Sequence, residues 1–178
     1  MEDYIAIICE GEAEKAIMDI LLESGSLIYE KADLLDEEVM FRCKAKVFES
    51  QYLNRNFRGR KVHVVRIHDS VKEKFKISKT YASKIAGIDS YITRPEIEML
   101  IILAENKYVD YKNKYIRTMK PGDYCKQVLR FRGVKKYDFV LDYFKDVNRL
   151  IETLRKYERV KNDSYRCIYD LVKESMKK

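Results

Sequence analysis

The chain has 178 residues, of which 46% are hydrophobic, and this size fits one compact domain or a domain with a small appendage. The sequence contains no long uncharged apolar run, which excludes a predicted transmembrane helix. The net charge of +7 is uneven: residues 107–178 hold 20 Lys and Arg against 10 Asp and Glu (+10), which leaves 16 against 19 (−3) for residues 1–106.

The uneven charge has two interpretations. A basic surface beside an acidic pocket suits a polyanionic partner, DNA or RNA, that is gripped near a metal ion. A lysine-rich soluble surface would give the same composition. The four cysteines (Cys9, Cys43, Cys125 and Cys167) form no CxxC pair, which argues against a zinc site and against a disulfide framework. Reduced thiols in a cytoplasm are the simplest interpretation, so we expect a cytoplasmic protein.

The first predicted element is the stretch Tyr4–Glu14, in which a strand leads directly into a helix. The apolar run before Glu10 is too short for a helix and rich in β-branched residues, so it predicts a buried strand. Gly11 permits a sharp turn, and residues 13–22 carry a helical apolar pattern. Glu10 is therefore expected at the carboxyl end of a strand, where ligands gather in open α/β sheets. The alternative is a solvated loop carboxylate.

The next predicted elements lead to a second acidic residue. We expect a short strand at residues 27–32 and a helix over 40–57. The β-branched stretch 61–69 predicts a second clear strand that ends in Asp69. Residues 72–84 predict a polar helix or loop, and a third short strand is expected at 88–92.

A third acidic residue comes with the stretch 93–106. Thr93 and Glu96 have the spacing of a capping box, with Pro95 in the first turn of the predicted helix. The following residues are apolar almost all round the helix, which is typical of a buried helix. Glu98 would therefore be a buried carboxylate, which is costly unless it is paired, protonated or bound to a cation. A structural salt bridge with Lys or Arg is the alternative.

From Lys107 onward the pattern is all helical, so we expect an α/β domain over residues 1–106 and a basic helical extension over 107–178 packed on it. Helices are predicted at 108–118, at 124–131 with Asp123 as the N-cap, at 138–157, and from 163 or 164 to 176. Tyr124 and Phe131 are candidate stacking surfaces for bases. The basic residues expected to grip a nucleic-acid backbone are Lys120, Lys126, Arg130, Arg132, Lys135 and Lys136.

Glu10, Asp69 and Glu98 are the candidate metal ligands. If the strands are parallel neighbours, the first two lie at one edge of the sheet. Carboxylate oxygens suit Mg²⁺ or Mn²⁺, and such an ion can polarise a phosphoryl oxygen and generate a hydroxide nucleophile. The sequence has no Walker A, GxGxxG or GxSxG motif that would indicate another chemistry. His63 and His68 would point to opposite faces of one strand, so a two-histidine metal site is not expected. His68 either orients water or phosphate or is structural.

Three stretches carry a resemblance to Toprim domains. IICEGEAEKAIMDILL resembles their opening motif, VVRIHD resembles their second acidic strand, and TRPEIEMLIILAE is similar to the third motif of RloB-like members. The resemblance covers roughly residues 4–106, and the superfamily includes OLD-type nucleases and bacterial phage-defence proteins. It implies an α/β fold with a small, mostly parallel sheet flanked by helices. It also implies a magnesium-dependent nuclease, and it is compatible with a partner ATPase subunit or a homo-oligomer.

By this resemblance Glu10 would be the metal-linked acid and a general acid or base, Asp69 the first Asp of an Asp-x-Asp motif, and Glu98 the late acid. The second Asp of that motif would fall at Val71, and it is missing. Glu73 is the nearest substitute and comes two residues late. The alternatives are a site that binds one metal ion weakly, a site that uses Glu12 or Glu14, and an inactive site.

Two functions of different classes follow. The first is a metal-dependent phosphodiester hydrolase acting on DNA or RNA, with a role in phage defence. The second is a non-catalytic module that binds nucleic acid or a partner protein. Nucleotidyl transfer, as in primases, is a third possibility.

Overall fold

A parallel sheet of four strands forms the centre of the molecule, whose computed structural model describes residues 3–161 and 163–177. The strand order is β2-β1-β3-β4, and every neighbouring pair is parallel. The strands are β1 (Tyr4–Cys9), β2 (Met40–Phe41), β3 (Val62–His68) and β4 (Ile85–Ile92). All four strands therefore end at the same edge, and the predicted α/β class with a parallel sheet is confirmed.

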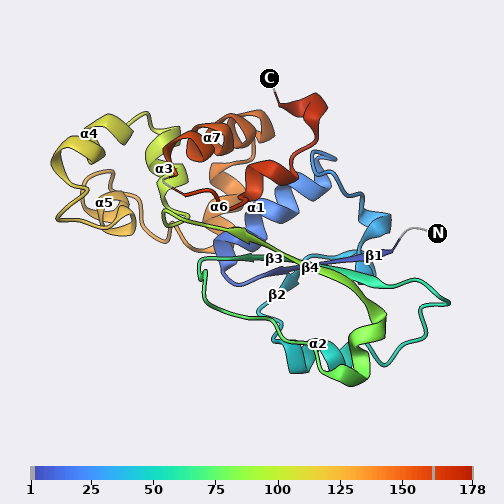
Figure 1. Ribbon diagram of the computed structural model, residues 1–178. Coiled ribbons are helices and arrows are strands. Elements are labelled where there is room, and N and C mark those ends of the chain that lie inside the picture. Colours follow the sequence, from blue (N-terminus) through green and yellow to red (C-terminus); the bar gives the residue numbers. More distant parts are fainter. Residues whose placement is uncertain (1–2, 162, 178) are drawn as a thin grey trace.

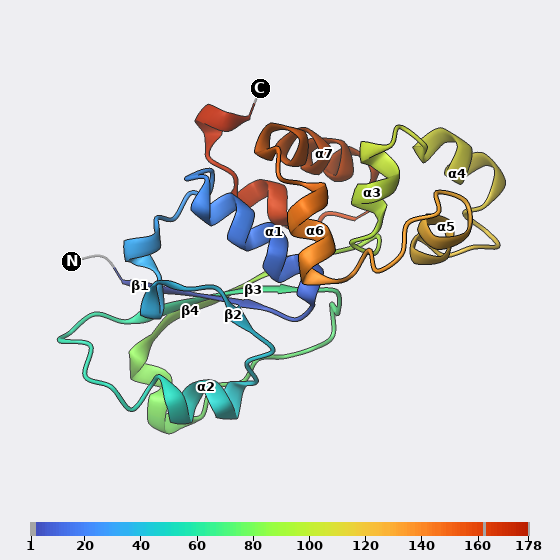
Figure 2. The same ribbon diagram turned by 180° about the vertical axis from the view of Figure 1, so that it is seen from behind.

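Helices cover both faces of the sheet, as expected for parallel strands whose sequences are apolar on both sides (Figure 1). Helix α2 (Ala45–Gln51) lies on one face, and α4 (Tyr108–Lys114) and α5 (Pro121–Gln127) extend beyond the carboxyl ends of the strands. The opposite face carries α1 (Glu12–Glu23), α3 (Met99–Ala104), α6 (Tyr137–Tyr143) and α7 (Val147–Val160), and Figure 2 shows the same layers from behind.

The hydrophobic core follows the two faces of the sheet. A smaller cluster around Phe48 and Val64 lies under α2. The larger cluster joins Ile7 of β1 with residues on both sides of position 107, such as Leu100 of α3 and Leu150 of α7. The helical extension thus shares one core with the sheet, while its description as a separate domain from residue 107 stays a prediction.

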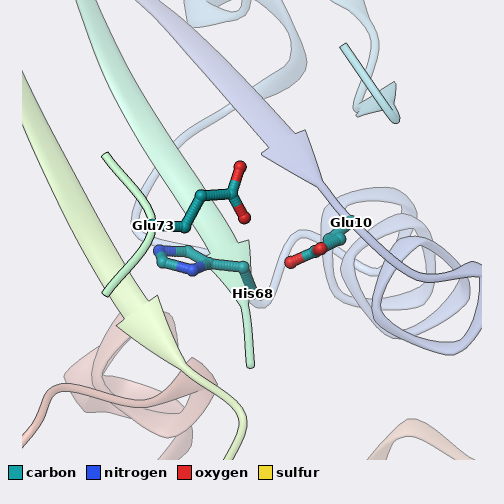
Figure 3. Close-up of side chains that lie close together, drawn as sticks. All are labelled: Glu10, His68 and Glu73. Atoms are coloured by element: carbon teal, nitrogen blue, oxygen red, sulfur yellow. The ribbon is translucent and has the colours of Figure 1, made fainter. Parts of the chain in front are cut away.

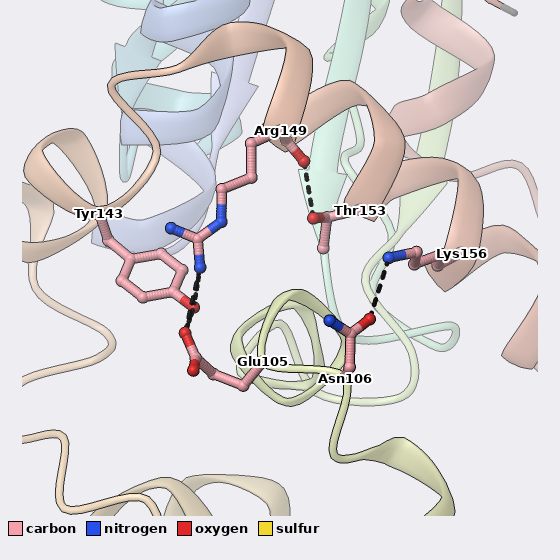
Figure 4. A network of polar contacts seen from close by, with 6 residues as sticks. All are labelled: Glu105, Asn106, Tyr143, Arg149, Thr153 and Lys156. Atoms are coloured by element: carbon pink, nitrogen blue, oxygen red, sulfur yellow. Dashed lines mark hydrogen bonds and ion pairs between the residues drawn. The ribbon is translucent and has the colours of Figure 1, made fainter.

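A polar network holds the end of α3 against α6 and α7 (Figure 4). The Arg149 guanidinium donates to the Glu105 carboxylate at 3.1 Å and to the Tyr143 hydroxyl at 2.8 Å. The Lys156 ammonium donates to the Asn106 side-chain oxygen at 3.3 Å. These contacts fix the position of α3, whose N-cap residue is Glu98.

Several predicted elements differ from the structure. The helix predicted over 40–57 is the short strand β2 followed by α2, and of residues 27–32 only Leu27 pairs, in an isolated antiparallel bridge with Val172. The helix predicted over 138–157 is divided into α6 and α7. The final predicted helix to residue 176 is replaced by two 3₁₀ turns, Ile168–Leu171 and Glu174–Met176.

The helix predicted over 93–106 is also shorter than expected, since α3 begins at Met99. The capping box was wrong because the Thr93 hydroxyl donates to Glu14 at 3.2 Å and caps no helix. Asp123 was wrong as an N-cap, because α5 begins at Pro121. Among the described helices, none combines the length and the apolar content that crossing a bilayer needs.

Candidate functional site

A cavity of about 440 Å³ opens at the carboxyl edge of the sheet, and all three predicted acids line it. Glu10 follows β1, Asp69 follows β3, and Glu98 precedes α3. The cavity brings together six carboxylates and three basic residues, namely Glu10, Glu12, Glu14, Asp69, Glu96 and Glu98 with Arg42, Lys135 and Lys136. The expected convergence of distant acids therefore occurs at the edge of the sheet where ligands usually bind.

Glu14, in the first turn of α1, is a buried member of this cavity. Its side chain accepts the hydrogen bond from Thr93, and a Cβ at Gly11 would lie 2.1 Å from its Oε2. Burial raises the pKa of the Glu14 carboxyl, the hydrogen bond from Thr93 opposes this effect, and the nearby charges of Asp69 and Glu98 add to it. The acids are thus close enough to interact electrostatically.

Glu98 is only 2% exposed and forms a salt bridge, as the structural alternative predicted. Its Oε1 lies 2.8 Å from the Lys135 ammonium, whose side chain is 68% exposed. Its Oε2 is buried and has no hydrogen-bond partner among the described residues. A Cβ at Gly122 would lie 2.7 Å from Oε1, so α5 packs closely against this carboxylate. Glu98 is therefore paired on one side and unsatisfied on the other.

The geometry for a metal ion differs from the predicted set. Within the described ranges, the only group of three or more His, Cys, Asp or Glu residues with ligand atoms within 4.8 Å of one another is Glu10, His68 and Glu73. Figure 3 shows the carboxylates of Glu10 and Glu73 close to the His68 ring. Glu10, Asp69 and Glu98 share a cavity but do not meet this distance, so they do not fit one ion as they lie.

Strand register explains why His68 lies near Glu10. Strands β1 and β3 pair from Tyr4 with Val62 to Cys9 with Ile67, so Glu10 and His68 come next in register. Register partners in a parallel sheet point to the same face, and the residue after each points to the other face. The sequence analysis named Glu73 and His68 separately. Alternation along β3 sets the face of His68, but its position next to Glu10 depends on strand register, and Glu73 lies in the loop after β3.

The electrostatics at this group reflect crowding. Burial raises the pKa of the Glu10 carboxyl, and the charges of Glu73 and Asp69 raise it further, while Arg66 opposes them. Burial lowers the pKa of His68, and the positive charge of Arg66 lowers it further. The charges of Glu73 and Asp69 and the backbone of Ser70 oppose this lowering of the His68 pKa. A neutral imidazole is the form that binds metals.

A second cavity of about 490 Å³ lies on the α2 side of Glu10 and is more basic. Arg42, Lys44, Arg66 and Lys74 line it together with Glu10 and other residues. The Arg66 guanidinium contacts Glu73 at 3.2 Å, while its Nε and Nη1 have no hydrogen-bond partner among the described residues. Glu10 is therefore at the boundary between an acidic and a basic cavity.

The six predicted nucleic-acid contacts lie together next to the acidic cavity, and all six are exposed. A groove of about 800 Å³ is lined by five of them, Lys120, Lys126, Arg132, Lys135 and Lys136. Arg130 lines an adjoining hollow with Lys126 and Arg132. The groove and the acidic cavity share Glu96, Glu98 and the two lysines at 135 and 136.

The predicted stacking surfaces are less available. Tyr124 was wrong as a stacking surface, because its ring is fully buried and its hydroxyl donates to Asp110 at 2.8 Å. Phe131 is half-buried against Phe139 and Tyr143. The described groove thus offers positive charge more than aromatic rings.

Comparison with known proteins does not extend this description. No protein-family model, no curated protein and no solved structure matches the chain.

Proposed function

We propose that the protein is a metal-dependent phosphodiester hydrolase that acts on DNA or RNA. The observation that carries the proposal is the basic groove that runs directly into a cavity lined by six carboxylates. A polyanion held in such a groove has its phosphates next to the acids that can hold a divalent ion. The resemblance of residues 4–106 to Toprim nucleases agrees with this proposal and with a role in phage defence.

The roles of the residues follow from their positions. Lys135 and Lys136 line both the groove and the cavity, so they can contact the phosphate nearest the acids. Glu10 belongs to the cavity and to the group of metal-binding geometry. A divalent ion held through Glu10 would supply the Lewis acid that polarises the phosphoryl oxygen. Asp69 and Glu98 then line the part of the cavity in which water and the phosphate would meet.

The test is cleavage of DNA and of tRNA with Mg²⁺ or Mn²⁺ by the wild-type chain and by Glu10→Ala. We expect metal-dependent cleavage that falls by about 100-fold or more in the variant. Glu152→Gln is the matched control, because this exposed residue of α7 lines none of the cavities described above. Cleavage that survives Glu10→Ala contradicts the proposed site.

A second candidate is a non-catalytic module that binds nucleic acid or a partner protein. The pairing of Lys135 with Glu98 at 2.8 Å and of Lys136 with Glu12 at 3.3 Å favours it, because both lysines neutralise acids of the cavity. Nucleic-acid binding that is equal in wild type and Glu10→Ala, with no cleavage under any metal, supports the module.

A further inference from the structure

The group Glu10, His68 and Glu73 joins three parts of the chain at one point. Glu10 follows β1, His68 ends β3, and Glu73 comes from the loop after β3. Their ligand atoms lie within 4.8 Å of one another. Ligands at about 2.1 Å from one ion are separated by roughly 3 to 4 Å, so small side-chain movements bring all three onto it.

His68 supplies an observation that is independent of the two acids. The residue is 2% exposed, and neither ring nitrogen has a hydrogen-bond partner of acceptable geometry among the described residues. The backbone of Ser70 interacts with the ring but forms no hydrogen bond of good geometry with either nitrogen. A buried imidazole with so weak a partner is unfavourable, because it has lost its contacts with water. In Figure 3 the ring lies beside the Glu73 side chain, with the Glu10 carboxylate on the other side of the His68 Cβ. A cation held among the three side chains would give the ring a partner.

The two carboxylates are only partly balanced, by the charge of Arg66 and, for Glu10, by a backbone hydrogen bond from Asp69. Glu73 is paired with Arg66 at 3.2 Å through Oε1, which leaves its second oxygen available. Glu10 has no salt bridge to another described residue. A cation between these carboxylates would remove their repulsion and satisfy the imidazole at the same time.

We propose that Glu10, His68 and Glu73 form a binding site for a divalent transition-metal ion, with Mn²⁺ preferred over Mg²⁺. One imidazole nitrogen and two carboxylates suit Mn²⁺, Fe²⁺ or Zn²⁺, whereas Mg²⁺ favours oxygen ligands alone. His68 and Glu73 thereby take the place of the acid that is missing at Val71. A catalytic role for this ion rests on the proposed function, whereas the binding of the ion is independent of that function.

The experiment titrates Mn²⁺ into the metal-free full chain and follows the free ion by electron paramagnetic resonance. We expect one site per chain, with affinity lower by about tenfold or more in His68→Gln and in Glu73→Gln. Mg²⁺ should compete weakly. His63→Gln is the matched control, because this residue is on the same strand but contacts Asp89 at 2.9 Å, and its affinity should equal that of wild type.

A spin-echo measurement of the bound Mn²⁺ separates a ligand from a merely structural residue. Modulation from an imidazole nitrogen is expected in wild type and in His63→Gln. Its absence from wild type, or unchanged affinity in both site variants, overturns the proposal. If His68→Gln fails to fold, two measurements still test the proposal. They are the nitrogen modulation in wild type and the Mn²⁺ affinity of Glu73→Gln, whose substitution is at an exposed residue. Mn²⁺ binding without cleavage refutes the hydrolase but supports the metal site. Glu10-dependent cleavage without the nitrogen signal supports the hydrolase but refutes the metal site.

Discussion

Gly11 separates Glu10 from the first turn of α1, and its missing side chain leaves room for the Glu14 carboxylate. Its φ of −106° and ψ of 159° are ordinary extended values. The sequence predicted a sharp turn at Gly11, but the backbone conformation does not require glycine here. The requirement is space, because a Cβ would come within 2.1 Å of the Glu14 Oε2.

The substitution Gly11→Ala should destabilise the fold by about 1 kcal/mol, measured by urea unfolding. The added methyl displaces the Glu14 carboxylate, and its hydrogen bond from Thr93 is lost. The cost stays small because the end of a side chain moves and the backbone does not. The same substitution in a Glu14→Ala background should be nearly neutral, and equal costs in both backgrounds would contradict this explanation.

At the residue scale, the sequence predicted which acids converge but not how they group. Glu10, Asp69 and Glu98 were recognisable because each is at the start or end of an apolar element. The pairing of Glu10 with His68 depends on strand register, which a single sequence does not specify. Glu98 was correctly expected to be buried, and its lysine partner is distant in sequence.

At the scale of elements, the best amphipathic stretch is interrupted where Asp146 begins a new helix. The Asp146 side chain accepts hydrogen bonds from the backbone N–H groups of Asn148 and Arg149, at 3.0 and 3.5 Å. Apolar periodicity continues across this break, so it could not reveal the break. The capping residue could have done so, because Asp is a preferred N-cap.

Asp146→Ala should therefore lower the free energy of unfolding by about 1 kcal/mol. The loss reflects two N–H groups of α7 that are left without an acceptor. Asp142→Ala removes an acid that is 86% exposed and whose contact with Lys145 is long, at 3.8 Å. The effect of this substitution on stability should therefore be close to zero. Equal losses for the two variants in urea unfolding would show that charge, and not capping, is responsible.

Helix α5 and the residues after it carry the basic groove, whose role is testable through salt. Lys126, Arg130 and Arg132 are exposed and form no ion pair with another described residue, so they are available to phosphates. Replacing all three with Gln should weaken nucleic-acid binding on any sequence. The slope of log K against log salt concentration should fall by up to about 0.7 to 0.9 for each contact that is lost.

The matched control for this measurement replaces lysines elsewhere on the surface, at Lys46, Lys76 and Lys79, which are exposed and line none of the cavities described above. Fluorescence anisotropy at several salt concentrations gives both slopes. An unchanged slope in the groove variant, or an equal change in the control, would place the interface elsewhere.

At the scale of the whole molecule, the last part of the chain returns to the edge strand of the sheet. The Ile92 N–H donates to the Arg166 carbonyl at 2.7 Å, and the Arg166 guanidinium donates to the Asp89 carboxylate at the same distance. These bonds hold the C-terminal segment beside β4. The hydrogen bond from Arg166 lowers the pKa of Asp89, and His63 contributes in the same direction.

Asp89→Asn should therefore destabilise the fold near neutral pH by about 1 kcal/mol, because the acid is one third exposed and partly screened. A lowered folded-state pKa gives stability that is present above the unfolded value of about 3.9. That stability is lost as pH falls through the folded-state pKa. Wild type and variant should thus converge in acid, as measured by thermal unfolding across pH, while Glu174→Gln should have little effect at any pH.

The fold class was predictable because two apolar strands and the helical patterns between them are local properties of the sequence. The C-terminal path was not, because residues 163–177 form short turns whose position is set by distant partners. Val172 pairs with Leu27, and Cys167 packs into the core beside the helices. Such long-range contacts leave no periodic signal.

The bridge between Leu27 and Val172 also has a consequence for biosynthesis. Leu171 and Val172 are fully buried in the cluster that covers β1 and β3. The strands leave the ribosome early, but the cluster on one face of the sheet stays incomplete until residue 172 has emerged. We therefore expect the nascent polypeptide to complete its folding late and in one cooperative step. Until then its exposed hydrophobic surface should be bound by chaperones.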